Sequence, residues 1–66
     1  MTDRYVDLRP DDTHPVEVEW RGAWYPGELE AYRRVDDQWS GWVRFTTGLA
    51  ETRIDWFPEG RIRKGG

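Results

Sequence analysis

The sequence predicts an all-β domain in which five short antiparallel strands close into a small barrel or sandwich. Apolar and charged residues alternate with a period of two along several runs, most clearly over residues 16–20. Clusters of Gly, Pro and Asp separate these runs, and no stretch keeps a helical repeat beyond a single turn. Short strands joined by tight turns favour a closed sheet, because closure removes exposed strand edges.

The first 15 residues predict a flexible N-terminal arm, since they contain four Asp, two Pro and few aliphatic residues. Tyr5, Val6 and Leu8 leave open a short edge strand within this arm. The first barrel strand is predicted over residues 16–20, with Val, Val and Trp on one face and two Glu on the other.

A turn at Arg21-Gly22 leads into a second strand over residues 23–34. Pro26-Gly27 predicts a bend or bulge near its start, because Pro cannot donate a ladder hydrogen bond and Gly tolerates unusual dihedral angles. The polar sequence Asp36-Asp37-Gln38 predicts the next turn.

The third strand is predicted over residues 39–46, with one face formed by Gly41, Val43 and Phe45. A connection over 47–51 precedes a fourth strand over 52–57. Pro58-Glu59-Gly60 ends that strand through one helical turn, and residues 61–63 form a short fifth strand. Residues 64–66 are expected to be a frayed tail.

Composition limits the functions that a chain of 66 residues can perform. Five Trp, three Tyr and two Phe supply a core, since each aromatic side chain buries about 150–250 Å². The absence of Cys excludes disulfides and thiolate chemistry, and no apolar run approaches the ~20 residues that cross a bilayer. The N-terminus lacks the pattern of a signal peptide, so we expect a cytoplasmic protein that makes no membrane contact.

The sequence gives no indication of an enzyme, and we expect no catalytic residue, cofactor or metal site. The single histidine, His14, precedes a proline and has no Cys or second His as a partner. The acid pairs Asp11-Asp12 and Asp36-Asp37 fall on predicted turns, where carboxylates are normally solvated. There is also no Gly-rich phosphate loop.

Four motifs follow one another between residues 16 and 63: Val-x-Val-x-Trp, Trp-Tyr-Pro-Gly-x-Leu, Trp-Val-Arg-Phe and Asp-Trp-Phe-Pro-x-Gly-Arg-Ile. Their order resembles the Tudor and chromo-barrel branch of the SH3-like barrels, which implies a five-stranded SH3-like barrel over this range. Family members that bind methylated lysine or arginine use an aromatic cage, and the resemblance places its walls at Trp20, Tyr25 and Phe45. Tudor domains often carry a further aromatic where this chain has Thr46-Thr47-Gly48. Another Trp has to complete a cage, or the resemblance is to the scaffold alone.

We therefore expect a non-enzymatic binding module that presents an aromatic groove to a protein or peptide partner, including one with a methylated or otherwise cationic side chain. The candidate groove residues are Trp20, Trp24, Tyr25, Trp42, Phe45 and Trp56, with an acidic rim of Glu17, Glu19 and Glu28. Strand alternation also favours Trp20 and Phe45 as core residues, whereas Trp24 and Trp42 fall out of phase and are surface candidates. Exposed Trp side chains are compatible with a weak homodimer as well as with a monomer.

The charge distribution leaves a nucleic-acid-associated barrel as the alternative. Net charge is −3, made up of −5 in residues 1–38 and +2 in residues 39–66. This balance disfavours a general nucleic-acid binder, which requires a broad basic face. The second part nevertheless offers a candidate phosphate-contacting strip formed by Arg44, Arg53, Arg61, Arg63 and Lys64, with Trp42 to stack on a base.

Overall fold

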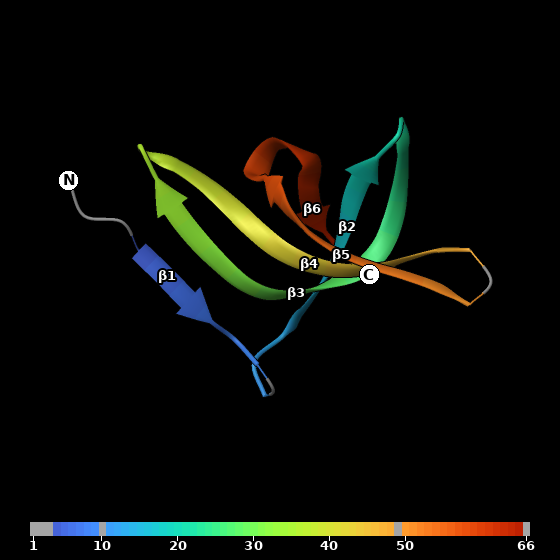
Figure 1. Ribbon diagram of the computed structural model, residues 1–66, viewed down its shortest axis with the longest axis horizontal. Coiled ribbons are helices and arrows are strands. Elements are labelled where there is room, and N and C mark those ends of the chain that lie inside the picture. The colour runs from blue at the N-terminus through green and yellow to red at the C-terminus, as the bar shows by residue number, and fades with distance from the viewer. Residues whose placement is uncertain (1–3, 10, 49, 66) are drawn as a thin grey trace.

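The computed structural model describes residues 4–9, 11–48 and 50–65. Its strands are β1 (Arg4–Asp7), β2 (His14–Trp20), β3 (Ala23–Val35), β4 (Gln38–Gly48), β5 (Glu51–Pro58) and β6 (Ile62–Lys64), with a 3₁₀ turn, η1 (Glu59–Arg61), before β6. All pairings are antiparallel, in the order β5-β4-β3-β2-β6 (Figure 1). The prediction of an all-β chain is confirmed. No helix in the described part is long and apolar enough to span a membrane.

The N-terminal segment is not a flexible arm throughout, because it contains the short edge strand that the sequence left open. Residues 4–7 form β1, which pairs with the second half of β3, and Tyr5 lies opposite Arg33 (Figure 1). His14 and Pro15 belong to β2. The edge strand forms because β3 continues beyond the end of β2, so its residues 31–34 have backbone groups that β1 can pair.

The bulge in β3 lies further along the strand than predicted. Pro26 and Gly27 pair with β2 in regular register, and the register with β4 shifts instead between Leu29 and Ala31, which makes Glu30 the extra residue. Pro26 is tolerated because pairing of β3 with β4 starts only at Gly27, so the missing N–H does not interrupt that ladder.

Both predicted hairpin turns are confirmed, at Arg21-Gly22 and at Asp36-Asp37. All four residues have positive φ angles, between 51° and 78°, as in the tight turns whose twist matches that of paired strands. The predicted connection over 47–51 is shorter than expected, because β4 continues to Gly48 and β5 begins at Glu51.

The C-terminal end is ordered where a frayed tail was predicted. The expected helical turn after Pro58 is η1, and the last strand, β6, includes Lys64, which pairs with Val16. The N–H of Gly65 donates to the carbonyl of Pro15 at 3.2 Å. Both partners, Val16 and Pro15, belong to the edge of β2 that β3 leaves free. Gly66 lies outside the described residues.

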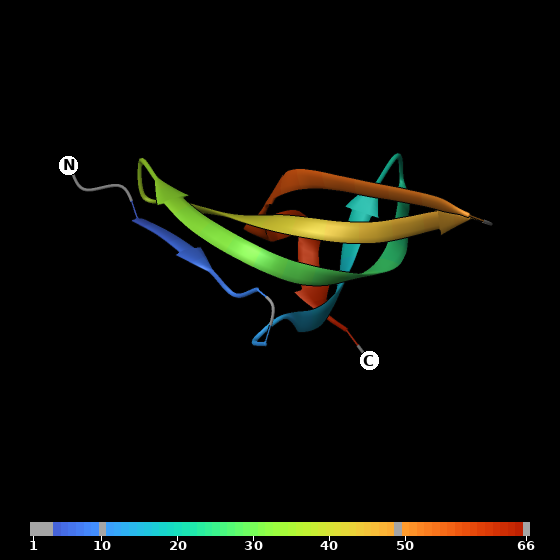
Figure 2. The ribbon, with the colours of Figure 1, turned by 60° about the horizontal axis from the view of Figure 1, so that its bottom comes forward.

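The core lies on the concave face of the bent sheet. It consists of Val16, Val18, Val43, Phe45 and Phe57, with Trp20, Tyr25, Leu29 and Ile62 packed against it. The sheet bends so far that β6 reaches over to β4 (Figures 1 and 2). A Cβ on Gly41 of β4 would lie 2.6 Å from Leu29 Cδ1 and 2.7 Å from Ile62 Cδ1, so only glycine leaves room for this contact.

Candidate functional site

The six aromatic residues predicted to line one groove lie in three separate places. Trp20, Tyr25 and Phe45 meet on the core face, with ring centroids 5.8 to 6.3 Å apart. The ring centroids of Trp42 and Trp56 lie 5.3 Å apart on the outer face. Trp24 lies elsewhere on the outer face, on β3, with the guanidinium of Arg63 over its ring. A single groove does not form, because strand alternation sends neighbouring residues to opposite faces of the sheet.

The three residues at the cage positions do converge, but Phe45 is buried and side chains of the chain itself lie over Trp20. Phe45 is 1% exposed and belongs to the core, as its strand alternation predicted. The guanidinium carbons of Arg21 and Arg53 lie 4.5 and 4.7 Å from the Trp20 ring centroid. Cations of the chain itself therefore already occupy this aromatic surface.

Trp42 and Trp56 belong to an aromatic cluster on the outer face. The ring centroid of Trp56 lies 6.2 Å from that of Tyr5 in β1. The guanidinium carbon of Arg33 lies 4.0 Å from the Trp56 centroid. Ala31, the cross-strand partner of Trp42, is fully buried on this face. These contacts connect β1 to β5 across the outer face of the sheet.

The predicted acidic rim and the predicted basic strip largely neutralise each other. Glu17 pairs with Arg63 at 2.7 Å and Glu19 with Arg61 at 3.7 Å, from β2 to β6 and η1. The two remaining arginines of the strip also have carboxylate partners, Arg44 with Glu30 and Arg53 with Glu51. Glu28 and Lys64 have no ion-pair partner among the described residues.

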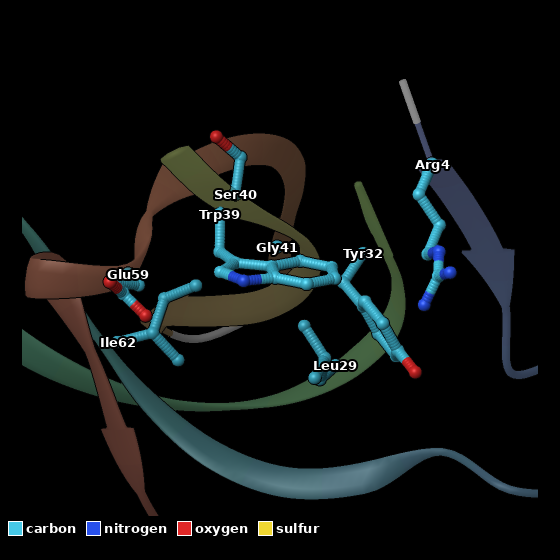
Figure 3. Close-up of a pocket in the computed structure, with 8 residues that line it drawn as sticks. All are labelled: Arg4, Leu29, Tyr32, Trp39, Ser40, Gly41, Glu59 and Ile62. Carbon is cyan, nitrogen blue, oxygen red and sulfur yellow. The ribbon is translucent and has the colours of Figure 1, made fainter. Parts of the chain in front are cut away.

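A hollow in the described structure lies between the concave sides of β3 and β4 and the turn η1. We call it the Trp39 groove. It is open, has a volume of about 630 Å³, and is lined by Arg4, Leu29, Tyr32, Trp39, Ser40, Gly41, Glu59 and Ile62 (Figure 3). Leu29 and Ile62 form an apolar floor over Gly41. The rings of Tyr32 and Trp39 stand beside this floor, with centroids 5.3 Å apart and planes inclined by 60°.

The bulge at Glu30 builds one wall of this groove. In a regular strand Leu29 would share its face with residues 31 and 33. The extra residue changes the phase, so that Leu29 and Tyr32 point to the same side, opposite Val43 and Gly41 of β4. Trp39 follows the ordinary alternation of β4 and joins them.

Neither comparison by sequence nor comparison by structure identifies a relative. No family model, curated protein or solved structure matches the chain.

Sequence reasoning missed Tyr32 and Trp39 as site residues. The sequence could have indicated Trp39, because it is in phase with Gly41 and Val43 on the core face. Gly41 has no side chain, so the surface beside Trp39 stays open. The sequence contains no such indication for Tyr32, because unbroken alternation from Leu29 places Tyr32 on the outer face. Its position follows from the bulge alone.

The Trp39 groove offers a surface for packing contacts. Its surface is apolar and aromatic, with one guanidinium and one carboxylate at the sides. The hydroxyl of Ser40 points away from the Trp39 ring (Figure 3). Both rings are only partly buried, so they present faces against which apolar side chains can pack.

Proposed function

We propose that this chain is a non-enzymatic binding module that holds an extended segment of a partner protein in the Trp39 groove. The observation that carries the proposal is the pair of partly exposed rings, Tyr32 and Trp39, beside the apolar floor of Leu29 and Ile62. Grooves lined by aromatic side chains bind extended peptide segments, because rigid rings provide contact area at low entropic cost. The proposed site therefore lies elsewhere than the six aromatic residues that the sequence predicted to line a groove.

We also propose that β2 to β6 form the SH3-like barrel that the sequence resemblance implies. Two features support this proposal: β6 pairs with β2, and Ile62 of β6 approaches Gly41 of β4 across the core. The proposal includes no cation held against the rings at the cage positions, because Arg21 and Arg53 already lie over the Trp20 ring.

Selection from a phage library of random ten-residue peptides tests the proposed binding function. We expect the wild-type protein to enrich peptides with apolar central residues. The enriched peptides should bind at least about tenfold more weakly to Trp39→Ala, because truncation of a central aromatic commonly costs 2 kcal/mol or more. Binding is measured by isothermal titration calorimetry with synthetic versions of the peptides.

Trp24→Ala is the matched control, since Trp24 is also a partly buried indole but lies on the outer face. It should bind the selected peptides as the wild type does, and circular dichroism confirms that both variants fold. Equal affinity of Trp39→Ala and the wild type, or no enrichment of any peptide, would contradict the proposal.

A further inference from the structure

The Trp39 groove has charges of opposite sign on its two sides. Figure 3 shows Arg4, from β1, on one side and Glu59, from η1, on the other, with Leu29, Ile62 and the two rings between them. Both charged residues are exposed. A chain laid across the apolar floor therefore runs from a guanidinium towards a carboxylate.

Arg4 stands apart from the other arginines of the chain. Six arginines lie within 4.0 Å of a carboxylate: Arg9, Arg34, Arg44, Arg53, Arg61 and Arg63. Two more, Arg21 and Arg33, lie over Trp rings. Within the described ranges Arg4 has neither kind of partner, and Glu59 likewise forms no ion pair there. One side of this groove therefore carries the one arginine of the described ranges without such a partner. The carboxylate on the other side is also unpaired there, as are Glu28 and Lys64 elsewhere on the surface.

Building on the proposed function, we infer that the Trp39 groove selects a charge-polarised segment of a partner protein. The segment has an apolar centre, an acidic side chain next to Arg4 and a basic side chain next to Glu59. The exposed guanidinium forms charge-assisted hydrogen bonds to a carboxylate, and the carboxylate of Glu59 accepts them from Lys or Arg. Opposite charges at the two sides also fix the direction in which the segment lies, because the reversed segment meets like charges.

Four synthetic ten-residue peptides test this inference. They share one Pro- and Leu-rich centre and differ only at their flanks, which carry Arg then Glu, Glu then Arg, two Arg, or two Glu. Affinities are measured by the fluorescence change of the protein on titration at low salt. We expect one of the two mixed peptides to bind most tightly, by about tenfold over its reversed counterpart, since each exposed ion pair contributes about two- to fivefold.

Exchange of the two charges provides the decisive variant. In the double variant Arg4→Glu, Glu59→Arg the preference should move to the other mixed peptide, and in Arg4→Glu alone it should move to the peptide with two Arg. Added salt should reduce all these differences. Arg53→Glu is the control, because Arg53 is an exposed arginine outside the groove lining that already pairs with Glu51, and it should keep the wild-type preference.

The outcomes separate this inference from the proposed function. Equal binding of all four peptides, or a preference that the double variant does not reverse, overturns the charge-polarised ligand and leaves the groove as a peptide site. If none of the four peptides binds and the phage selection also enriches none, both proposals are overturned.

Discussion

Glu30 is the charged side chain that the described fold buries, with 8% of it exposed. One carboxylate oxygen, Oε2, lies 3.0 Å from Nε of Arg44, whereas Oε1 has no hydrogen-bond partner among the described residues. A buried carboxylate has lost most of its hydration, so its free energy depends strongly on the one cation it contacts. Arg44 of β4 therefore stabilises Glu30, the extra residue of the bulge in β3.

The first prediction concerns this pair. Arg44→Met should destabilise the protein by about 2 kcal/mol or more, because it leaves the buried Glu30 carboxylate without its cation. Arg34→Met is the matched control, since Arg34 is similarly exposed but pairs with Asp37, which is 79% exposed. It should change the free energy of unfolding by less than about 1 kcal/mol. Urea denaturation measures both variants, and equal losses would show that Glu30 does not depend on Arg44.

Single residues were predictable from the sequence where strand alternation alone decides their environment. Phe45 and Val43 are buried as their phase on β4 indicates. Tyr32 and Glu30 were not predictable, because the register shift that places them depends on how β3 pairs with β4, and residues of both strands determine it. The candidate groove depends on that shift, so the sequence alone did not locate it.

The end of β1 is held by a local contact between Asp7 and Arg9. The backbone N–H and the side-chain Nε of Arg9 both donate to Asp7 Oδ1, at 2.9 and 3.0 Å, and Nη2 donates to Oδ2 at 2.8 Å. The side-chain hydrogen bonds from Arg9, followed by the backbone hydrogen bond, lower the pKa of Asp7 from 3.8 to about 2. The contact lies at the end of β1, the strand on which Arg4 lines the groove.

The second prediction is the pH dependence of this contact. A pKa that is lower in the folded state means that the stabilising contribution is fully present above pH ~4 and is lost as the pH falls towards about 2. NMR titration of the Asp7 carboxyl carbon should give a midpoint near 2 in the wild type. In Arg9→Ala the midpoint should return towards 3.8. A wild-type midpoint near 3.8 would show that the contact does not persist in solution.

Most strands were predictable as elements, and the errors lie at their ends. Alternation and turn residues placed β2 to β5 to within a few residues, because both signals are local. The pairings at the two termini were less predictable: the N-terminal edge strand was left open, and Lys64 was expected in a frayed tail. β1 forms because β3 continues beyond its pairing with β2, and β6 forms because one edge of β2 is not paired by β3. Both are properties of the assembled sheet.

On the scale of the whole molecule, ion pairs between distant segments determine the surface potential. Arg63 and Glu17 lie 46 positions apart in the sequence, yet they are cross-strand neighbours at 2.7 Å. The excess of basic residues in the second part of the chain therefore does not form a basic face, since acidic residues of β2 and β3 neutralise it. Only the folded topology reveals this pairing, and it bears directly on the nucleic-acid alternative.

The third prediction is that the wild-type protein does not bind DNA measurably. Non-specific binding requires several cations that release phosphate counterions and typically gives dissociation constants of about 10⁻⁴ to 10⁻⁶ M. With four of the five candidate basic residues paired to carboxylates, we expect a dissociation constant weaker than about 1 mM at low salt. Fluorescence anisotropy with labelled single- and double-stranded oligonucleotides measures it.

The double variant Glu17→Gln, Glu19→Gln supplies the comparison, because it removes the partners of Arg63 and Arg61 and changes the net charge from −3 to −1. It should bind both oligonucleotides more tightly than the wild type does, and added salt should abolish this gain. Strong, salt-sensitive binding by the wild type, unchanged in the variant, would mean that the paired arginines exchange their carboxylates for phosphates. The nucleic-acid alternative would then replace the peptide groove as the leading function.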